Sequence, residues 1–188
     1  MMPLVLAALG LGAAVPSDPS CTVWFASEPV SRYGVRVHAE ATVEAPLDAV
    51  LKVLEDFDHY AEYMPRVRRA ERRPGNLVYT EIASPWPLKD VWFVAQVARE
   101  RAGSATSVRW TTRSGNLRTN EGAWTLSTRA DGRTRLRYEG LVELYHPIPP
   151  PLLRMVEAHE LPLVVQAIRA RAVGGGALTC AQTEVSLF

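Results

Sequence analysis

The most informative segment of the sequence is VRVHAEATVEAPLDAVLKVLEDFDHYAEYMPRVRRAE, which runs from Val35 to Glu71. Apolar and polar side chains alternate from Val35 to Val43, which is the period of a strand with one buried face. Pro46 then starts a helix, because proline is favoured in the first turn. The apolar stripe of this helix consists of Val50, Leu51, Val53 and Leu54. A second short helix is predicted from Phe57 to Tyr63, ending before Pro65.

From Arg66 to Leu144 the chain is predicted to form a series of strands separated by turns. The turns are indicated by Pro74-Gly75-Asn76, Ala102-Gly103-Ser104, Ser114-Gly115-Asn116 and Asp131-Gly132. Such short connections favour antiparallel neighbours. On the last strand the arginines at 133, 135 and 137 are expected to face water, and the residues between them to face inward. On the strand before it, Trp124 and Leu126 are expected to face inward too.

A long amphipathic helix is predicted from about Pro150 to Ala172. Pro162 lies inside it, so we expect a kink or a break into two pieces at that point. A run of glycines from Gly174 ends the helix, and residues 174–188 are predicted to form a flexible tail. One strand, two short helices, six further strands and a long helix indicate an α+β fold.

The composition is that of an ordinary globular domain. The chain has 188 residues, of which 47% are hydrophobic and 22% charged, with a formal net charge of +1. This length suits a single domain. So small a net charge lacks the basic footprint of nucleic-acid-binding proteins, so no nucleic-acid partner is predicted.

Motifs for catalysis or metal binding are absent from the sequence. It has no Gly-x-Ser-x-Gly elbow and no GxxxxGK phosphate loop. His159-Glu160 begins like a zinc-protease helix, but the fourth residue after His159 is Leu163 instead of histidine. The other histidines, at 38, 59 and 146, lie on separate predicted elements. We therefore predict no metal, no cofactor and no catalytic residue.

The first 17 residues, MMPLVLAALGLGAAVPS, have the character of a signal peptide. They contain no charged side chain, and a short apolar run from Leu4 to Val15 ends in small residues that suit cleavage after Ala14 or Ser17. The run is too short to span a bilayer. Export to the periplasm or the exterior is expected, with residues 18–34 as an N-terminal extension. The alternative is an N-terminal helix that stays and packs.

Two cysteines, Cys21 and Cys180, bracket the predicted domain and are too far apart for a CxxC motif. They are candidates for one disulfide, which an oxidising compartment would permit. Closing so long a loop would restrict the unfolded chain by about 4–5 kcal/mol. The alternative is two unrelated free thiols.

Four stretches resemble the START-like superfamily: VEAPLDAVLKVLEDFDHYAEYMPRVRRAE from Val43, SPWPLKDVWFVAQV from Ser84, GAWTLSTRADGRTRLRYEG from Gly122, and HPIPPPLLRMVEAHELPLVVQAIRARA from His146. They follow in the order of that superfamily and span about residues 35–172. Lys89-Asp90 stands where relatives commonly have Arg-Asp, so a bidentate arginine contact is not assumed there. The domain is assigned to residues 35–173.

The resemblance implies a helix-grip fold, in which a curved antiparallel seven-stranded sheet wraps around the long C-terminal helix. Between them it leaves a cavity that in relatives holds sterols, phospholipids, quinones or polyketides. The expected function is non-catalytic binding or transport of a lipid-like hydrophobic ligand. The alternative is a polyketide cyclase or aromatase that uses the same cavity for chemistry.

Candidate cavity residues come from the predicted strands and from one face of the long helix. They are Phe93, Trp110, Trp124, Tyr138, Val156, Glu160, Val164 and Ile168. The alternative for each aromatic residue is a place in the ordinary core. Glu160 is the most informative, because a carboxylate in an apolar stripe must meet a partner or a polar ligand head. The alternative is that the break at Pro162 turns Glu160 to solvent.

The five arginines at 66, 68, 69, 72 and 73 form a basic run. Such a run can contact an anionic membrane surface while a ligand passes, so a transient membrane contact is one prediction. The alternative is a solvated strand edge, on which charge discourages aggregation.

Overall fold

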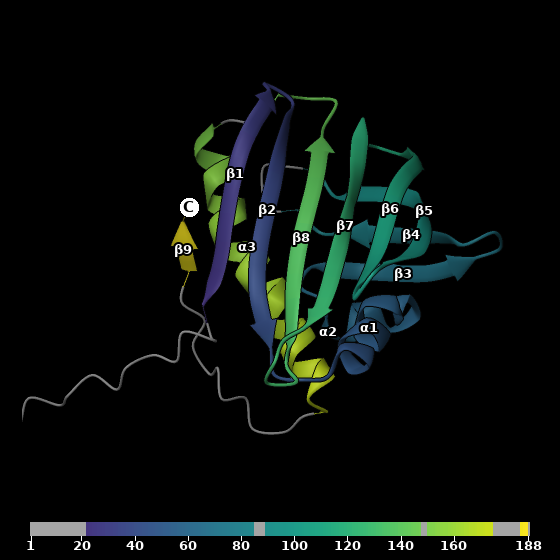
Figure 1. The fold of residues 1–188 in the computed structure, drawn as a ribbon. Coiled ribbons are helices and arrows are strands. Elements are labelled where there is room, and N and C mark those ends of the chain that lie inside the picture. The colour runs from purple at the N-terminus through teal and green to yellow at the C-terminus, as the bar shows by residue number, and fades with distance from the viewer. Residues whose placement is uncertain (1–21, 85–88, 148–149, 175–184, 188) are drawn as a thin grey trace, which may run out of the picture.

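The computed structural model describes residues 22–84, 89–147, 150–174 and 185–187, and in its last helix it describes side chains from Glu160 onward. Within these ranges lie one sheet and a set of helices (Figure 1). The strands are β1 (Val23–Ser31), β2 (Gly34–Val43), β3 (Val67–Arg73), β4 (Leu77–Ile82), β5 (Val91–Ala102), β6 (Ala105–Gly115), β7 (Thr119–Thr128), β8 (Thr134–Glu143) and β9 (Val185–Leu187). The helices are α1 (Leu47–Glu55), the 3₁₀ helix η2 (Phe57–His59), α2 (Tyr60–Tyr63) and α3 (Pro150–Ala172).

The strands form a single sheet in the order β3-β4-β5-β6-β7-β8-β2-β1-β9. All neighbouring pairs are antiparallel except β1 and β9, which run parallel. Strands β3 to β8 follow one another both in the chain and in the sheet, as the predicted short turns require. In two of these turns Gly103 and Gly132 have φ angles of 60° and 80°, which glycine adopts without a steric penalty.

The sheet has two strands more than the seven predicted. The additions are β1, from the predicted N-terminal extension, and the three-residue β9, from the predicted C-terminal tail. In β1 only the first residues alternate, with Val23 and Phe25 buried and Trp24 exposed, and its second half is exposed. That pattern is too short to predict a strand, and Pro29 lowers the strand propensity further. Proline is tolerated there because β9 pairs only with Val23–Phe25, so Pro29 lies on the edge of the sheet.

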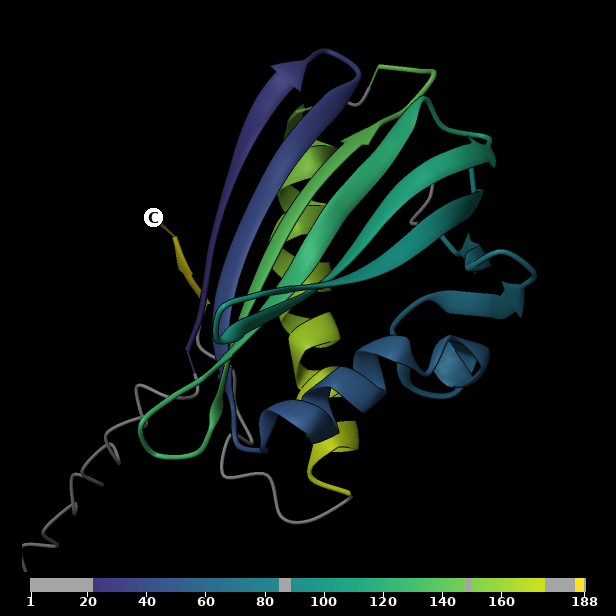
Figure 2. The ribbon, with the colours of Figure 1, turned by 45° about the vertical axis from the view of Figure 1, so that its right-hand side comes forward.

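The sheet curves around α3, which lies along its concave side, while α1 and α2 lie at one end (Figure 2). This is the helix-grip arrangement that the resemblance implied. Of the two outcomes predicted at Pro162, the break into two pieces does not occur, because α3 runs as one helix with Pro162 inside it. Pro162 is buried, so the packing of α3 against the rest of the domain holds the helix together despite the lost backbone hydrogen bond.

The main core joins α1 to the sheet and to α3. All four residues of the predicted α1 stripe are buried. Leu54 packs in one cluster with Leu136 of β8 and Ile168 of α3, and each of the three is at most 1% exposed. Burying such a side chain contributes about 1.5–3 kcal/mol, so this cluster accounts for much of the stability at the helical end of the sheet.

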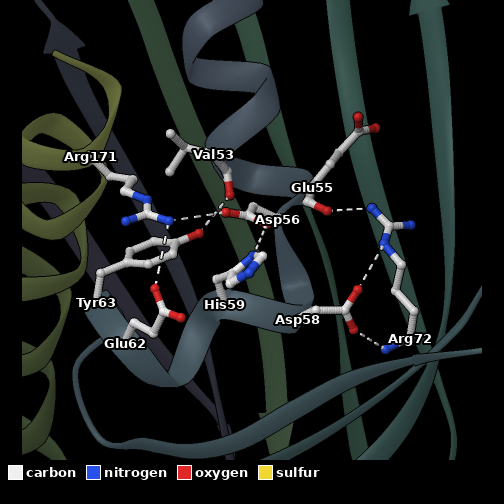
Figure 3. A network of polar contacts seen from close by, with 9 residues as sticks. All are labelled: Val53, Glu55, Asp56, Asp58, His59, Glu62, Tyr63, Arg72 and Arg171. Carbon is white, nitrogen blue, oxygen red and sulfur yellow. Dashed lines mark hydrogen bonds and ion pairs between the residues drawn. The ribbon is translucent and has the colours of Figure 1, made fainter. Parts of the chain in front are cut away.

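A polar network ties the C-terminal end of α3 to the corner between α1 and α2 (Figure 3). Asp56 Oδ1 lies 2.6 Å from His59 Nδ1, and the hydrogen bond raises the pKa of His59 and lowers that of Asp56. Arg171, in the last turn of α3, lies 3.4 Å from the other Asp56 oxygen and stacks over the Tyr63 ring. The Tyr63 hydroxyl donates to the Val53 carbonyl at 2.8 Å. These contacts fix the distance between α3 and the short helices at one end of the domain.

Candidate functional site

A cavity of about 450 Å³ lies between the concave face of the sheet and α3. Its wall comes from β2 to β8, from the short helices and from α3, and apolar side chains make up most of it. Val35 and Val37 of β2 contribute because alternate residues of a strand share one face. The volume falls within the range of small-molecule sites in proteins.

Three aromatic side chains from adjacent strands form what we call the aromatic plate: Trp110 of β6, Trp124 of β7 and Tyr138 of β8. The Trp110 and Tyr138 rings are inclined by only 26°, with centroids 5.7 Å apart. The Trp124 and Tyr138 centroids are 4.7 Å apart at an angle of 54°. The plate gives the cavity a broad aromatic wall against which a ligand can pack.

Polar groups in the cavity wall are few. Trp110 Nε1 donates to Asn120 Oδ1 at 3.0 Å, and the Tyr60 hydroxyl donates to the Leu54 carbonyl at 2.6 Å. Burial raises the pKa of Tyr138 to about 12 and raises that of Tyr60 further above its ordinary value. Both phenols therefore stay protonated and uncharged at neutral pH.

Among the described side chains, one ion pair lines the cavity. Arg66, between α2 and β3, donates from Nε to Glu160 Oε1 of α3 at 2.6 Å. The Glu160 side chain is 20% exposed and the Arg66 side chain is 41% exposed. The pair therefore lies where the wall of the cavity meets the protein surface. Arg66 has a φ of 60°, a conformation that residues other than glycine adopt at some energetic cost. Glu160 thus faces the cavity with a partner instead of turning to solvent, which offsets the cost of burying its charge.

Six of the eight predicted cavity residues line this one space: Phe93, Trp110, Trp124, Tyr138, Glu160 and Val164. Ile168 does not, because it is fully buried in the core cluster against α1. Val156 lies outside the described side chains, as Cys21 and Cys180 lie outside the described residues. That the six residues bind a ligand stays a prediction.

Sequence reasoning missed several polar residues of the wall, among them Asn120 and Arg66. Asn120 and Trp124 are four residues apart in β7, so their side chains lie on the same face of the strand. The alternation that predicted an inward Trp124 therefore also predicts that Asn120 faces the cavity. Arg66 was grouped with the basic run, and its role as the partner of Glu160 has no local signal, because the two residues are 94 positions apart.

The other four arginines of the basic run are each paired with an acid. Arg68 lies 2.7 Å from Asp90, and Arg69 and Arg73 lie 2.7 Å and 2.9 Å from Glu71. Arg72 lies 3.9 Å from Asp58. Contact of this run with a membrane surface stays a prediction.

Two further searches cover only the described part of the chain. Within it, no three His, Cys, Asp or Glu side chains gather closely enough to hold a metal ion. Among its helices, none combines the length and the apolar character needed to cross a membrane.

Solved structures with a similar fold cover most of the chain. A STAR-related lipid transfer protein from Xanthomonas axonopodis is 23% identical, with a TM-score of 0.67 over 78% of this chain and 91% of that one. A START superfamily protein from Mycobacterium smegmatis is 15% identical, with a TM-score of 0.60 over 73% and 97%. The Zhui aromatase/cyclase from Streptomyces sp. R1128 is 18% identical, with a TM-score of 0.60 over 78% and 100%. At these identities the likeness shows the fold alone.

Sequence comparison gives a more specific result. None of the curated proteins matches the chain. A family model described as "Polyketide cyclase / dehydrase and lipid transport" matches residues 43–169. Because this match spans more than half of the chain, the protein belongs to the polyketide cyclase / dehydrase and lipid transport family, within the START-like superfamily.

Proposed function

We propose that this protein binds one lipid-like hydrophobic molecule in the cavity and carries it without changing it. The observation that supports this best is the cavity itself, which is open to a ligand yet walled almost wholly by apolar side chains. The family includes lipid transport proteins, and one of the similar solved structures is named a lipid transfer protein. The same family includes cyclases, so membership alone does not distinguish ligand transport from catalysis. The distinction must come from the side chains that line the cavity.

The cavity volume limits the size of the ligand. A water molecule takes about 30 Å³ of liquid, so a space of about 450 Å³ holds on the order of fifteen groups of that size. This suits one acyl chain or one small ring system. Each buried methylene contributes about 0.8 kcal/mol, so ten of them supply about 8 kcal/mol before the cost of association. Apolar contact therefore supplies a large part of the binding free energy, against which the cost of association must be set.

The polar groups that line the cavity favour ligand transport as the function over acid–base catalysis. Arg66 and Glu160 are paired with each other, and the Tyr60 hydroxyl is bound to a backbone carbonyl. A general acid or base works best with a pKa near the working pH, and burial moves the pKa of Tyr60 and of Tyr138 away from neutrality.

Native mass spectrometry of the full chain, with organic extraction, tests the proposal. We expect protein purified from its own organism to carry one apolar molecule of cavity size, which denaturation releases. Incubation of that molecule with fresh protein should return it with its mass unchanged. Conversion into a second molecule would support the cyclase alternative, and protein that neither carries nor takes up an apolar molecule would contradict ligand binding.

Export with a Cys21–Cys180 disulfide is a second part of the proposal. It is supported by the apolar leader and by the parallel pairing of β1 with β9, in which Val23 lies opposite Val185. These two residues follow the two cysteines at short distances in the chain. N-terminal sequencing should find the mature chain starting at Val15 or Asp18. Thiol counting under denaturing conditions should find no free thiol, and two free thiols in exported protein would exclude the disulfide.

A further inference from the structure

A pair of glycines opposite each other in the sheet makes room for the aromatic plate. Gly122 of β7 pairs with Gly140 of β8. A β-carbon on Gly140 would lie 2.4 Å from the Tyr138 hydroxyl oxygen, and one on Gly122 would lie 2.6 Å from the Trp110 ring. Both distances are far below van der Waals contact. The rings of Tyr138 and Trp110 therefore lie over bare backbone, with their planes inclined by only 26°.

The Tyr138 hydroxyl lies over Gly140 and has no hydrogen-bond partner among the residues that the structure describes. Burial raises its pKa to about 12, so the phenol keeps its proton and is a hydrogen-bond donor. Polar groups at a cavity wall are normally hydrogen-bonded to protein, to water or to a ligand. A partly buried hydroxyl that lines the cavity and has no partner in the described part of the chain is therefore available to donate to a ligand.

A second donor flanks the same glycine pair. Asn120 is two residues before Gly122 on the same face of β7, and it also lines the cavity. Its Oδ1 accepts from Trp110 Nε1, and because an indole N–H can only donate, this bond fixes the orientation of the amide. The amide nitrogen then has both hydrogens available, with no partner in the described part of the chain.

Resting on the proposed function, we infer that the preferred ligand is a flat, ring-bearing hydrophobe with a hydrogen-bond-accepting oxygen, such as an aromatic ketone. The ring lies on the aromatic plate, and the Tyr138 hydroxyl donates to the oxygen, with the Asn120 amide beside it. Tyr138 is then a specificity-determining residue: it selects ligands by an acceptor atom, whereas the apolar wall selects only by size and shape.

Two probes of nearly equal shape test this inference. 2-Acetylnaphthalene carries a ketone oxygen, and 2-isopropylnaphthalene carries a methyl group in its place. Dissociation constants for both are measured by calorimetry on the full chain and on Tyr138→Phe, which removes only the hydroxyl. One neutral hydrogen bond corresponds to roughly a threefold to tenfold change in affinity. We expect the ketone-to-hydrocarbon affinity ratio to fall by that factor in Tyr138→Phe, with hydrocarbon binding unchanged.

Tyr79→Phe is the matched control, because it removes the same phenol hydroxyl. Tyr79 lies on β4 and does not line the cavity, so the loss of its hydroxyl should leave the ratio unchanged. A ratio that is the same in Tyr138→Phe and wild type would overturn the inference, while hydrocarbon binding by both proteins would still support the proposed function. Failure of the wild type to bind either probe would also overturn the inference, whereas the proposed function fails only if the protein neither carries nor takes up any apolar molecule in native mass spectrometry.

Discussion

Replacing Val164 by glutamate is expected to remove most binding of an apolar probe while the domain stays folded. Val164 lines the cavity from α3, one helical turn after Glu160, so two carboxylates would then share one wall. The new side chain occupies ligand space and must itself be desolvated. If it excludes two or three methylenes, at about 0.8 kcal/mol each, affinity falls roughly 10- to 50-fold. A fluorescent fatty acid titration beside far-ultraviolet circular dichroism measures both effects.

Leu163→Glu is the control, because it makes the same chemical change on the next residue of the helix. Leu163 is 45% exposed and does not line the cavity. Its replacement should leave probe affinity unchanged. If folded Val164→Glu binds the fluorescent fatty acid as tightly as the wild type, this face of α3 does not line the ligand site. Unfolding of Val164→Glu would indicate a filled core instead of a cavity.

Shortening Ile168 to alanine is expected to act on stability instead of binding. Ile168 lies one turn after Val164 on α3, but it is fully buried against α1 and the sheet. Truncating a buried isoleucine leaves a hole that the neighbours fill only in part, which lowers the free energy of unfolding by about 2–5 kcal/mol. Urea unfolding of Ile168→Ala and wild type measures the difference. Probe affinity should stay unchanged under conditions in which the variant is folded.

Leu163→Ala is the comparison for stability, because it removes an exposed aliphatic side chain of similar size from the same helix. Its effect should stay within about 0.5 kcal/mol. A loss of less than 1 kcal/mol in Ile168→Ala would contradict the core assignment of that residue. A large loss of probe affinity in folded Ile168→Ala would place Ile168 in the ligand site after all.

Local patterns in the sequence predicted the elements and their buried faces. The α1 stripe is buried as expected, and the alternation in β8 puts Leu136 in the core and Arg137 in solvent. Such patterns work because one side of a regular element meets water and the other does not. They failed for β1, where alternation covers only the first residues of an edge strand. At Pro162 they allowed a kink or a break, and the break does not occur because packing outweighs the local preference for one.

Residue patterns were sufficient to predict the order of the elements from β2 to α3, the inward face of most of them and the family to which the chain belongs. Packing in three dimensions, in contrast, decided which inward residues border empty space. Val164 and Ile168 share one stripe of α3, yet Val164 lines the cavity and Ile168 fills the core. It also decided that Glu160 meets Arg66 and that Tyr138 lies over Gly140. The period of apolar residues along the sequence indicates which side of a helix or strand avoids water. A cavity, in contrast, forms where side chains from elements far apart in the chain do not fill the space between them, and that cannot be predicted from the period of any one element.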